Sequence, residues 1–437
     1  MSSRPAILGG HPILSELCHL VRPTLPPLAE LLDGLGDLQA SRMLTNQGSF
    51  ARALEARIAA LIEVPYCALF ASGTTALLCL ARALDLTGEV ILPSFTFAAT
   101  AHALCWQGLR PRFVDVDPRT LHMTPELAEA AVTAETTALL PVNLFGSCGR
   151  LDGFEALAER RGLRLVFDSA QAFGARFDGR PVGSFGDAEV LSFHATKPFH
   201  TAEGGAVVTR RRDLYERLCR IRNFGFGSYL DCLELGLNGK LDDLSALLGL
   251  RLLDGFPAEV EARWRVLADY AQALSSVPGL SRPAVDPRTA PCPSYLTIRI
   301  DERAFGLNAL ELNYALMAER IVTRCYFYPP VHRTTYYQER LGADAPDLPA
   351  TDAAATSTLC LPLHAELAPE TVATIALAIR RAHEWAAPVR EALRGRTLAR
   401  APPRPRIGPG RSTARQGAGA RPRRHPQPSS RRVRGCP

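Results

Sequence analysis

The sequence predicts an α/β protein with a mainly parallel seven-stranded sheet covered by helices on both faces, followed by a smaller C-terminal α+β domain. Three observations indicate this fold. Short apolar runs alternate with amphipathic stretches from about residue 64 to residue 209, most of these runs are continuously apolar, and the pattern changes after residue 280. The expected strands are residues 67–70, 89–92, 112–116, 138–143, 163–168, 189–193 and 205–209.

Helices are expected before, between and after these strands. Residues 124–132 and 151–161 lie between strands and have helical periodicity. Residues 241–274 are expected to form one or two long helices, interrupted near Gly255-Phe256-Pro257. An amphipathic helical stripe precedes the first strand and consists of Phe50, Leu54, Ile58, Leu61 and Ile62.

Four segments are predicted along the chain: an N-terminal segment (1–45), a large α/β domain (46–255), a linking helix with a small C-terminal α+β domain (256–388), and a tail (389–437). Proline, glycine and arginine dominate the tail, so we expect it to be disordered. The small domain is expected to contain strands at 294–300 and 321–328 and helices at 307–320 and 369–385.

The composition excludes a wholly disordered, a collagen-like or a disulfide-scaffold protein. With 47% hydrophobic and 22% charged residues, the 437-residue chain has the balance of a globular protein with a large core. The net charge of +6 is misleading, because residues 401–437 hold ten arginines and no acidic residue, which leaves the first 400 residues at −4. Any basic surface for nucleic acid is therefore confined to the tail, and a nucleic-acid partner is disfavoured.

Three further features of the sequence predict a cytoplasmic protein. No apolar run approaches the ~20 residues that span a bilayer, and the N-terminus lacks the features of an export signal. Eleven cysteines are scattered singly without a C-x-x-C pair, which gives no support for a metal site and suits reduced thiols.

Three motifs are candidates for chemistry. Ser72-Gly73-Thr74 separates a strand from an apolar helix, where free backbone N–H groups can bind an anion, although an ordinary helix cap explains this motif alone better. Asp168 ends a buried strand, the position at which open α/β sheets bind ligands, and a structural cap or ion pair is about as good an explanation. Ser192 ends another strand and Lys197 follows five residues later; a lone loop lysine is usually a solvated charge.

Together these motifs predict a specific cofactor. The anion site, the acid and the lysine fall at the same edge of one parallel sheet. Pyridoxal 5′-phosphate (PLP) needs a cradle for its phosphate, a carboxylate for its pyridinium nitrogen and an amine that bonds to it.

The sequence also resembles a known family, the DegT-type sugar aminotransferases, which are PLP enzymes with the aspartate-aminotransferase fold (fold type I). The resemblance extends from about Met43 to Arg380. Within the family, the strings SFHATK, NGK and YFYPPVH are most similar to enzymes that aminate nucleotide-linked 4-keto-6-deoxyhexoses for antibiotics and surface sugars. The strings that carry the family resemblance are SGTTAL, PSFTFAATAHA, FVDVDP, FDSAQAFGA, SFHATKPFHTAEGGAVVT, RNFGF and LGLNGKLDDLSA.

The resemblance implies roles for the residues around the cofactor ring. Lys197 would bond the cofactor and act as the acid and base of the proton shift. Asp168 would keep the ring nitrogen protonated. Gln171 would bond the ring hydroxyl or stack nearby. Phe97 would stack on the ring face, where simple core packing is the alternative.

It also implies phosphate and substrate contacts. Asn238 matches an asparagine that reaches the phosphate in the neighbouring subunit, which implies a homodimer with shared sites. Lys240 and His332 are weaker candidates for contacting a nucleotide-linked sugar, and a structural role is at least as good an interpretation for both. The residues expected at the phosphate of the same subunit are Gly73, Thr74 and Ser192.

The function predicted in this way is the transfer of an amino group, from L-glutamate as the expected donor, to a keto group of a nucleotide-linked deoxy sugar. Three alternatives are a keto-cyclitol substrate, a catalytically degenerate partner protein, and PLP-dependent dehydration, for which relatives carry histidine at the position of Lys197. Residues 143–149 depart from the family pattern in a loop that approaches the active site, and the arginine-rich tail has no counterpart in it. A polyanion-binding role for that tail is a further alternative.

Overall fold

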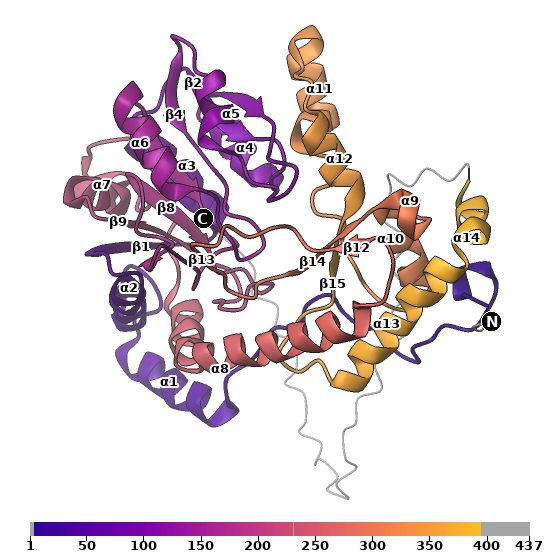
Figure 1. The fold of residues 1–437 in the computed structure, drawn as a ribbon. Coiled ribbons are helices and arrows are strands. Elements are labelled where there is room, and N and C mark those ends of the chain that lie inside the picture. Colours follow the sequence, from indigo (N-terminus) through magenta and orange to yellow (C-terminus); the bar gives the residue numbers. More distant parts are fainter. Residues whose placement is uncertain (1–3, 230, 395–437) are drawn as a thin grey trace, which may run out of the picture. The chain divides into compact units, whose positions relative to one another are not determined.

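The computed structural model describes residues 4–229 and 231–394, and the predicted tail lies almost entirely outside them. Its central feature is a seven-stranded sheet with the strand order β1-β9-β8-β5-β4-β2-β3 (Figure 1). β9 runs antiparallel to both of its neighbours and the other strands are parallel to one another. The prediction of a mainly parallel seven-stranded sheet is confirmed. The strands are β1 (Tyr66–Phe70), β2 (Glu89–Pro93), β3 (Arg110–Val114), β4 (Thr136–Leu139), β5 (Arg164–Asp168), β8 (Ala188–Ser192) and β9 (Gly205–Thr209).

Helices cover both faces of the sheet. Leu165 and Phe167 of β5 pack into one apolar cluster with α2, α5 and α6, whereas Val166 packs into a second cluster with α3, α4 and α7. This alternation explains why the strands are apolar at consecutive positions. The helices are α2 (Ser49–Ile62), α3 (Gly73–Ala83), α4 (Ala98–Trp106), α5 (Pro125–Ala130), α6 (Leu151–Arg161) and α7 (Arg212–Ile221).

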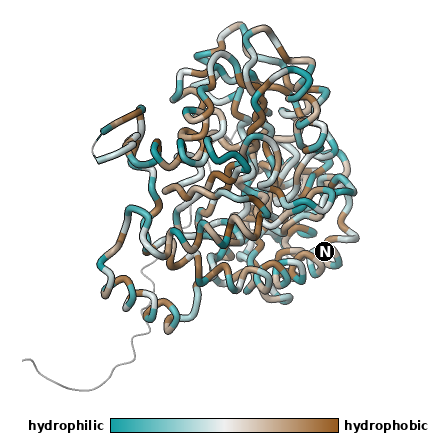
Figure 2. Tube along the Cα trace, turned by 90° about the vertical axis from the view of Figure 1, so that its left-hand side faces the viewer, coloured by the Kyte–Doolittle hydropathy of each residue, from teal (hydrophilic) through white to brown (hydrophobic). Residues whose placement is uncertain are grey.

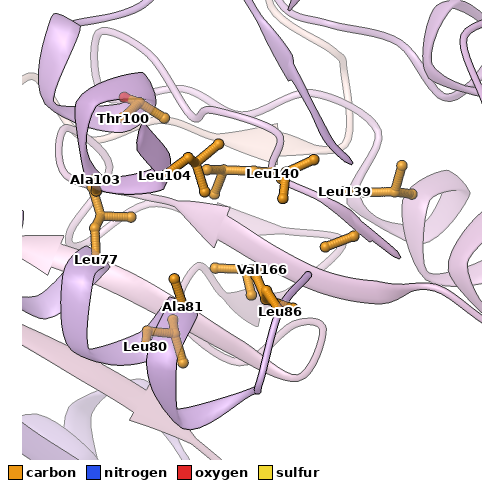
Figure 3. Close-up of a pocket in the computed structure, with 12 residues that line it drawn as sticks. Leu77, Leu80, Ala81, Leu86, Thr100, Ala103, Leu104, Leu139, Leu140 and Val166 are labelled. Atoms are coloured by element: carbon orange, nitrogen blue, oxygen red, sulfur yellow. The ribbon is translucent and has the colours of Figure 1, made fainter. Parts of the chain in front are cut away.

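A small gap remains inside the second cluster, between α3, α4 and the sheet (Figure 3). Its volume is about 10 Å³, and leucine, alanine and valine side chains form most of its wall. Such a volume is at the lower limit for a single water molecule, and an apolar wall offers a water no partners. We therefore interpret the gap as a packing defect rather than a ligand site.

One long helix, α8 (Asp243–Leu274), connects the sheet to the C-terminal elements (Figure 1). It begins at the cap Asp242, whose side chain accepts a hydrogen bond from the backbone N–H of Ser245. The helix continues through Pro257, so a single helix forms and the interruption expected near Gly255-Phe256-Pro257 is wrong. Its first half packs under the sheet and its second half packs in the C-terminal core. Hydrophobic and hydrophilic residues alternate along the helical turns of the chain (Figure 2).

The C-terminal part contains an antiparallel three-stranded sheet of β12 (Leu280–Ser281), β14 (Leu296–Ile300) and β15 (Thr358–Leu361). The strand expected at 321–328 is wrong, because this segment makes only isolated bridges at Ile321 and Arg324. Its aromatic side chains pack toward the sheet edge instead, and prolines follow at once. The main helices here are α10 (Ala309–Ala318), α13 (Pro369–Glu384) and α14 (Ala386–Leu393).

Several short elements complete the described chain. The N-terminal segment contains α1 (Leu28–Ser41), which packs on α8. No helix among the described residues is both long and apolar enough to cross a bilayer. The remaining elements are β6 (Arg176–Phe177), β7 (Arg180–Pro181), β10 (Phe226–Ser228), β11 (Asp231–Cys232), β13 (Thr289–Ala290), α9 (Glu302–Phe305), α11 (Thr335–Leu341) and α12 (Pro349–Ser357).

The last helix extends slightly further than expected, since α14 continues to Leu393 rather than ending near residue 388. Val389 and Leu393 are buried in the C-terminal core. We therefore predict that a chain ending at Arg394 keeps full activity and thermal stability. A chain ending at Ala387 should lose the burial of these two side chains, about 3–6 kcal/mol at full value, and unfold several degrees lower. Thermal unfolding of both truncations tests this, and a loss of activity in the 394-residue chain would reveal a role for the tail.

Candidate active site

The neighbouring strand ends of β1, β9, β8 and β5 bring the predicted site residues to one edge of the sheet. Phe70 at the end of β1 and Ser192 at the end of β8 both pair with Gly205 at the start of β9. Asp168 at the end of β5 pairs with Val190 of β8. The turn after β1, Ser192 and Asp168 therefore lie side by side.

The turn after β1 forms an anion cradle. The Ser72 side chain caps α3 by accepting a hydrogen bond from Thr75 N at 3.1 Å. The backbone N–H groups of Gly73 and Thr74 precede the first intrahelical bonds of α3 and lie at its positive end. A Cβ atom on Gly73 would lie 3.2 Å from Cβ of Ser192, so the turn directly faces this serine. The structure thus brings Gly73, Thr74 and Ser192 together as predicted, in a setting that fits a phosphate group.

Asp168 is a buried carboxylate fixed by two hydrogen bonds. Its Oδ2 accepts from the Thr100 hydroxyl at 2.7 Å and its Oδ1 accepts from Ala170 N at 3.1 Å. Burial raises the pKa of this carboxyl, and these hydrogen bonds and the charge of Lys197 lower it only in part. A pyridinium nitrogen next to the carboxylate would supply the missing positive charge. The chemistry of this donor set therefore fits the PLP ring.

Lys197 lies in the loop between β8 and β9. Backbone hydrogen bonds across this loop, from Phe193 N to Gly204 O (2.9 Å) and from Ala195 N to Ala202 O (2.7 Å), hold it in place. The Lys197 Nζ atom donates a hydrogen bond to the Tyr295 hydroxyl at 3.0 Å. Burial lowers the pKa of Lys197 to about 8, which increases the fraction of neutral amine able to act as a nucleophile or base.

Gln171 and Phe97 flank these groups. Gln171 is buried, and its Oε1 accepts a hydrogen bond from Phe145 N at 2.8 Å. Phe145 has a left-handed φ of 56°, a strained conformation for a bulky residue that is typical of functional sites. Phe97 directly precedes α4 and is 52% exposed, so core packing does not explain its position, and its ring is available to a ligand.

Asn238 is exposed and lies in a loop that docks near the cradle, since Gly239 O accepts a hydrogen bond from Ala71 N at 2.8 Å. Lys240 Nζ donates to Asn223 Oδ1 at 2.7 Å. This lysine lines a polar cavity of about 270 Å³ that it shares with two arginines rather than with Lys197 and Asp168.

His332 is not at the opening of the site. Its side chain is completely buried, with Nδ1 2.6 Å from the Ser94 hydroxyl. Burial lowers the pKa of this histidine, which favours the neutral ring. The structure therefore favours the structural interpretation of His332 over a substrate contact.

Two residues that contact Asp168 and Lys197 have no signal in the sequence that reveals them. Thr100 lies three residues after Phe97 on the first turn of α4, and only the fold shows that its hydroxyl reaches Asp168. Tyr295 is 98 positions away from Lys197 along the chain. Both contacts are tertiary, which a local pattern does not encode.

The fold and the edge site define a class of protein. A mainly parallel seven-stranded sheet carrying a partly buried lysine, a buried carboxylate and an anion cradle at one edge is the arrangement of a PLP-dependent transferase of fold type I. The chain belongs to the DegT/DnrJ/EryC1/StrS aminotransferase family, whose profile matches residues 29–380. It is a PLP-dependent aminotransferase.

Curated relatives and solved structures agree with this assignment. The chain is 35% identical over 361 residues to dTDP-4-amino-4,6-dideoxy-D-glucose transaminase of Shigella dysenteriae, covering 83% of this chain and 98% of that protein. It is 37% identical to UDP-N-acetyl-3-dehydro-alpha-D-glucosamine 3-aminotransferase of Acidithiobacillus ferrooxidans, over 80% of this chain and 93% of that protein. The crystal structure of DesI with its TDP-sugar product superimposes with a TM-score of 0.83 at 37% identity, covering 88% of this chain and 97% of DesI.

Proposed function

We propose that this aminotransferase moves an amino group, from L-glutamate as the expected donor, onto a keto group of a nucleotide-linked deoxy sugar in the cytoplasm. The amino sugar would serve an antibiotic or a surface glycan. The observation that carries the proposal is the convergence of Lys197, Asp168 and the cradle at one sheet edge. Relatives named for dTDP-sugar and UDP-sugar substrates support the substrate class.

Each residue of the site has a task in this reaction. Bound PLP supplies an electron sink that lets an amino group leave the donor and join the keto carbon. Asp168 would keep the ring nitrogen protonated, with its own orientation fixed by Thr100. Lys197 would hold the cofactor between turnovers and then, as a free amine, move the proton that completes the transfer.

Two alternatives are disfavoured by the residues present. Dehydrating relatives carry histidine where this chain has Lys197. A degenerate partner protein would be expected to lose some of Lys197, Asp168 and Ser192, and all three are present at the same edge.

The loop of residues 143–149, which differs from the family pattern, is the best candidate for determining which substrate is accepted. Asn143 at its start does not point into the open site, because its Nδ2 donates to the buried Ser169 hydroxyl at 2.9 Å. Phe145 reaches Gln171 through its backbone. The loop therefore contacts the site through Gln171, and its variation would alter the position of this side chain.

The proposed substrate class can be tested by incubating the purified protein with PLP, L-glutamate and separate nucleotide-linked keto sugars, and detecting amino products by mass spectrometry. A keto-cyclitol is included as the competing substrate class. An aminated nucleotide sugar supports the proposal. Amination of the cyclitol alone, with no nucleotide sugar converted, would contradict it.

We further propose a homodimer with shared active sites. Six apolar side chains on and around α1 are 41–70% exposed in the single chain, and exposed apolar side chains that gather on one element suit an interaction surface. Asn238 is exposed as well, which suits a contact with a second subunit. The apolar residues are Leu25, Leu28, Leu32, Leu35, Met43 and Leu44.

Mixing two inactive variants tests the shared site. We predict that Lys197→Ala and an Asn238 variant that has lost cofactor binding regain activity after subunit exchange, because one site of the mixed dimer collects both defects and the other collects neither. Random pairing at equal amounts would restore up to about a quarter of wild-type activity. Demonstrated exchange without recovery would show that Asn238 serves its own chain or no site at all.

A further inference from the structure

Tyr295 contacts the amine at the centre of the site. Its hydroxyl accepts the hydrogen bond from Lys197 Nζ at 3.0 Å, and Nζ lies 5.2 Å from the centre of its ring. Tyr295 directly precedes β14 in the C-terminal part of the chain, whereas Lys197 belongs to the loop after β8. The contact therefore joins the lysine to an element that neither cradles the phosphate nor carries Asp168.

Packing fixes the position of this hydroxyl. Tyr295 is only 5% exposed, and its ring meets two other rings edge to face, that of Phe145 at 6.2 Å and that of Tyr326 at 5.6 Å. Because Phe145 is itself bound through its backbone to Gln171, the ring of Tyr295 cannot turn without disturbing the ring-side wall of the site.

The hydroxyl is also electrically neutral. Burial raises the pKa of Tyr295 to about 12, although the hydroxyls of Thr196 and Tyr326 oppose this shift. The other titratable or charged groups that act on Lys197 are Tyr326, Asp168 and Arg324. A carboxylate in place of the hydroxyl would stabilise the ammonium ion, raise the pKa of Lys197 and so leave less of the free amine that reacts. A neutral acceptor also orients the amine but raises this pKa much less.

We propose that Tyr295 is a positioning residue for Lys197: its hydroxyl accepts a hydrogen bond from the ε-amino group whenever that group is not bonded to the cofactor, and so keeps the amine aimed at the atoms between which it moves a proton. This inference rests on the proposed role of Lys197. It gives Tyr295 a part in every turnover, after the lysine is released and before it bonds the cofactor again.

The test compares Tyr295→Phe with a matched control, Tyr270→Phe. The first change removes the hydroxyl and keeps the packed ring. The control removes another buried hydroxyl, which has no hydrogen-bond partner among the described residues. Both variants should unfold at nearly the wild-type temperature, and both should still carry the cofactor on Lys197.

The first readout does not depend on turnover. In full-length protein stripped of cofactor, the rate at which added PLP bonds to Lys197 is followed by absorbance at a pH above 9, where the amine is neutral. We expect this rate to fall about tenfold in Tyr295→Phe, as for the loss of one hydrogen bond to a reacting group. It should not change in Tyr270→Phe.

The second readout is the titration of the amine itself. The chain contains only two lysines, Lys197 and Lys240, so protein labelled with ¹³C at the lysine ε-carbon gives two resonances. The hydroxyl stabilises the charged amine, so its removal should lower the midpoint of Lys197 by about one pH unit from a value near 8 and leave Lys240 unchanged. A merely structural role would shift neither the midpoint nor the bonding rate.

The outcomes separate this inference from the function on which it rests. In turnover, kcat should fall about tenfold in Tyr295→Phe while KM for the sugar stays within about twofold. If bonding, titration and kcat of Tyr295→Phe match those of the control, or if only Tyr326→Phe slows bonding, the inference is overturned and the proposed function stands. If wild-type protein does not carry the cofactor on Lys197, the proposed function itself fails.

Discussion

Replacing Lys197 by alanine is expected to reduce amino transfer by at least about 10⁴-fold, because general acid–base catalysis alone supplies up to that factor and the variant also loses its bond to the cofactor. The protein should still fold, since the loop is held by backbone hydrogen bonds on either side of the lysine. Activity is measured as amino-sugar product formed per unit time.

The second lysine provides the control for this variant. Lys240→Arg keeps a positive charge in the polar cavity and leaves Lys197 as the sole lysine of the chain. It is expected to keep covalent attachment of the cofactor. Turnover in Lys197→Ala within a factor of ten of wild type would mean that another group moves the proton.

The second large effect is expected at Asp168. Asp168→Asn should lower turnover by roughly 100-fold or more, the scale on which a preorganised electrostatic contact acts, because a neutral amide does not keep the ring nitrogen protonated. The fold should tolerate the change. The Thr100 hydroxyl donates to Asp168 but also pairs with Thr96, so it can reverse and accept from the new amide.

Absorbance of the bound cofactor and product formation together check this prediction. The cofactor should still attach to Lys197 in the Asp168 variant, which separates loss of reactivity from loss of binding. A suitable control is Asp286→Asn. Asp286 pairs with Arg288 away from the sheet edge. Near-normal turnover in Asp168→Asn would show that a different acid serves the ring.

The seven-stranded sheet and the edge site were predictable because local sequence encodes them. The strands are buried on both faces, so each is a continuous apolar run, and the ends of parallel strands place Asp168 and Ser192 at one edge whatever the loops do. The glycine after Ser72 marks the tight approach of the cradle to Ser192. In these cases a short string of residues is sufficient to predict the local structure and its place in the fold.

The predictions from the sequence are wrong where tertiary packing outweighs the local pattern. A helix interior normally loses about 3 kcal/mol or more to a proline, yet α8 continues through Pro257. Phe256, next to it, packs against Phe173 and Phe199, and this burial helps to offset the cost. Residues 321–328 are apolar and aromatic like a strand, but Tyr326 and Phe327 instead build the wall beside Tyr295 and Phe145.

Contacts between distant segments could not be predicted from the sequence, because they also depend on tertiary packing. The Thr100 contact depends on how α4 lies over β5, and the Tyr295 contact depends on how the C-terminal sheet approaches the loop after β8. Neither the spacing along the chain nor the residue types predict these two contacts. The roles of Asn238 and Lys240 likewise depend on a second subunit and a substrate, and stay predictions.

The most direct test of the account is the site of covalent attachment of the cofactor. Protein loaded with PLP is reduced with borohydride, digested and mapped by mass spectrometry. With only two lysines in the chain, the result has few possible forms. The pyridoxyl group is expected on Lys197, unchanged in Lys240→Arg and absent in Lys197→Ala. A label on Lys240, or no stable label on the loaded wild-type protein, would contradict it.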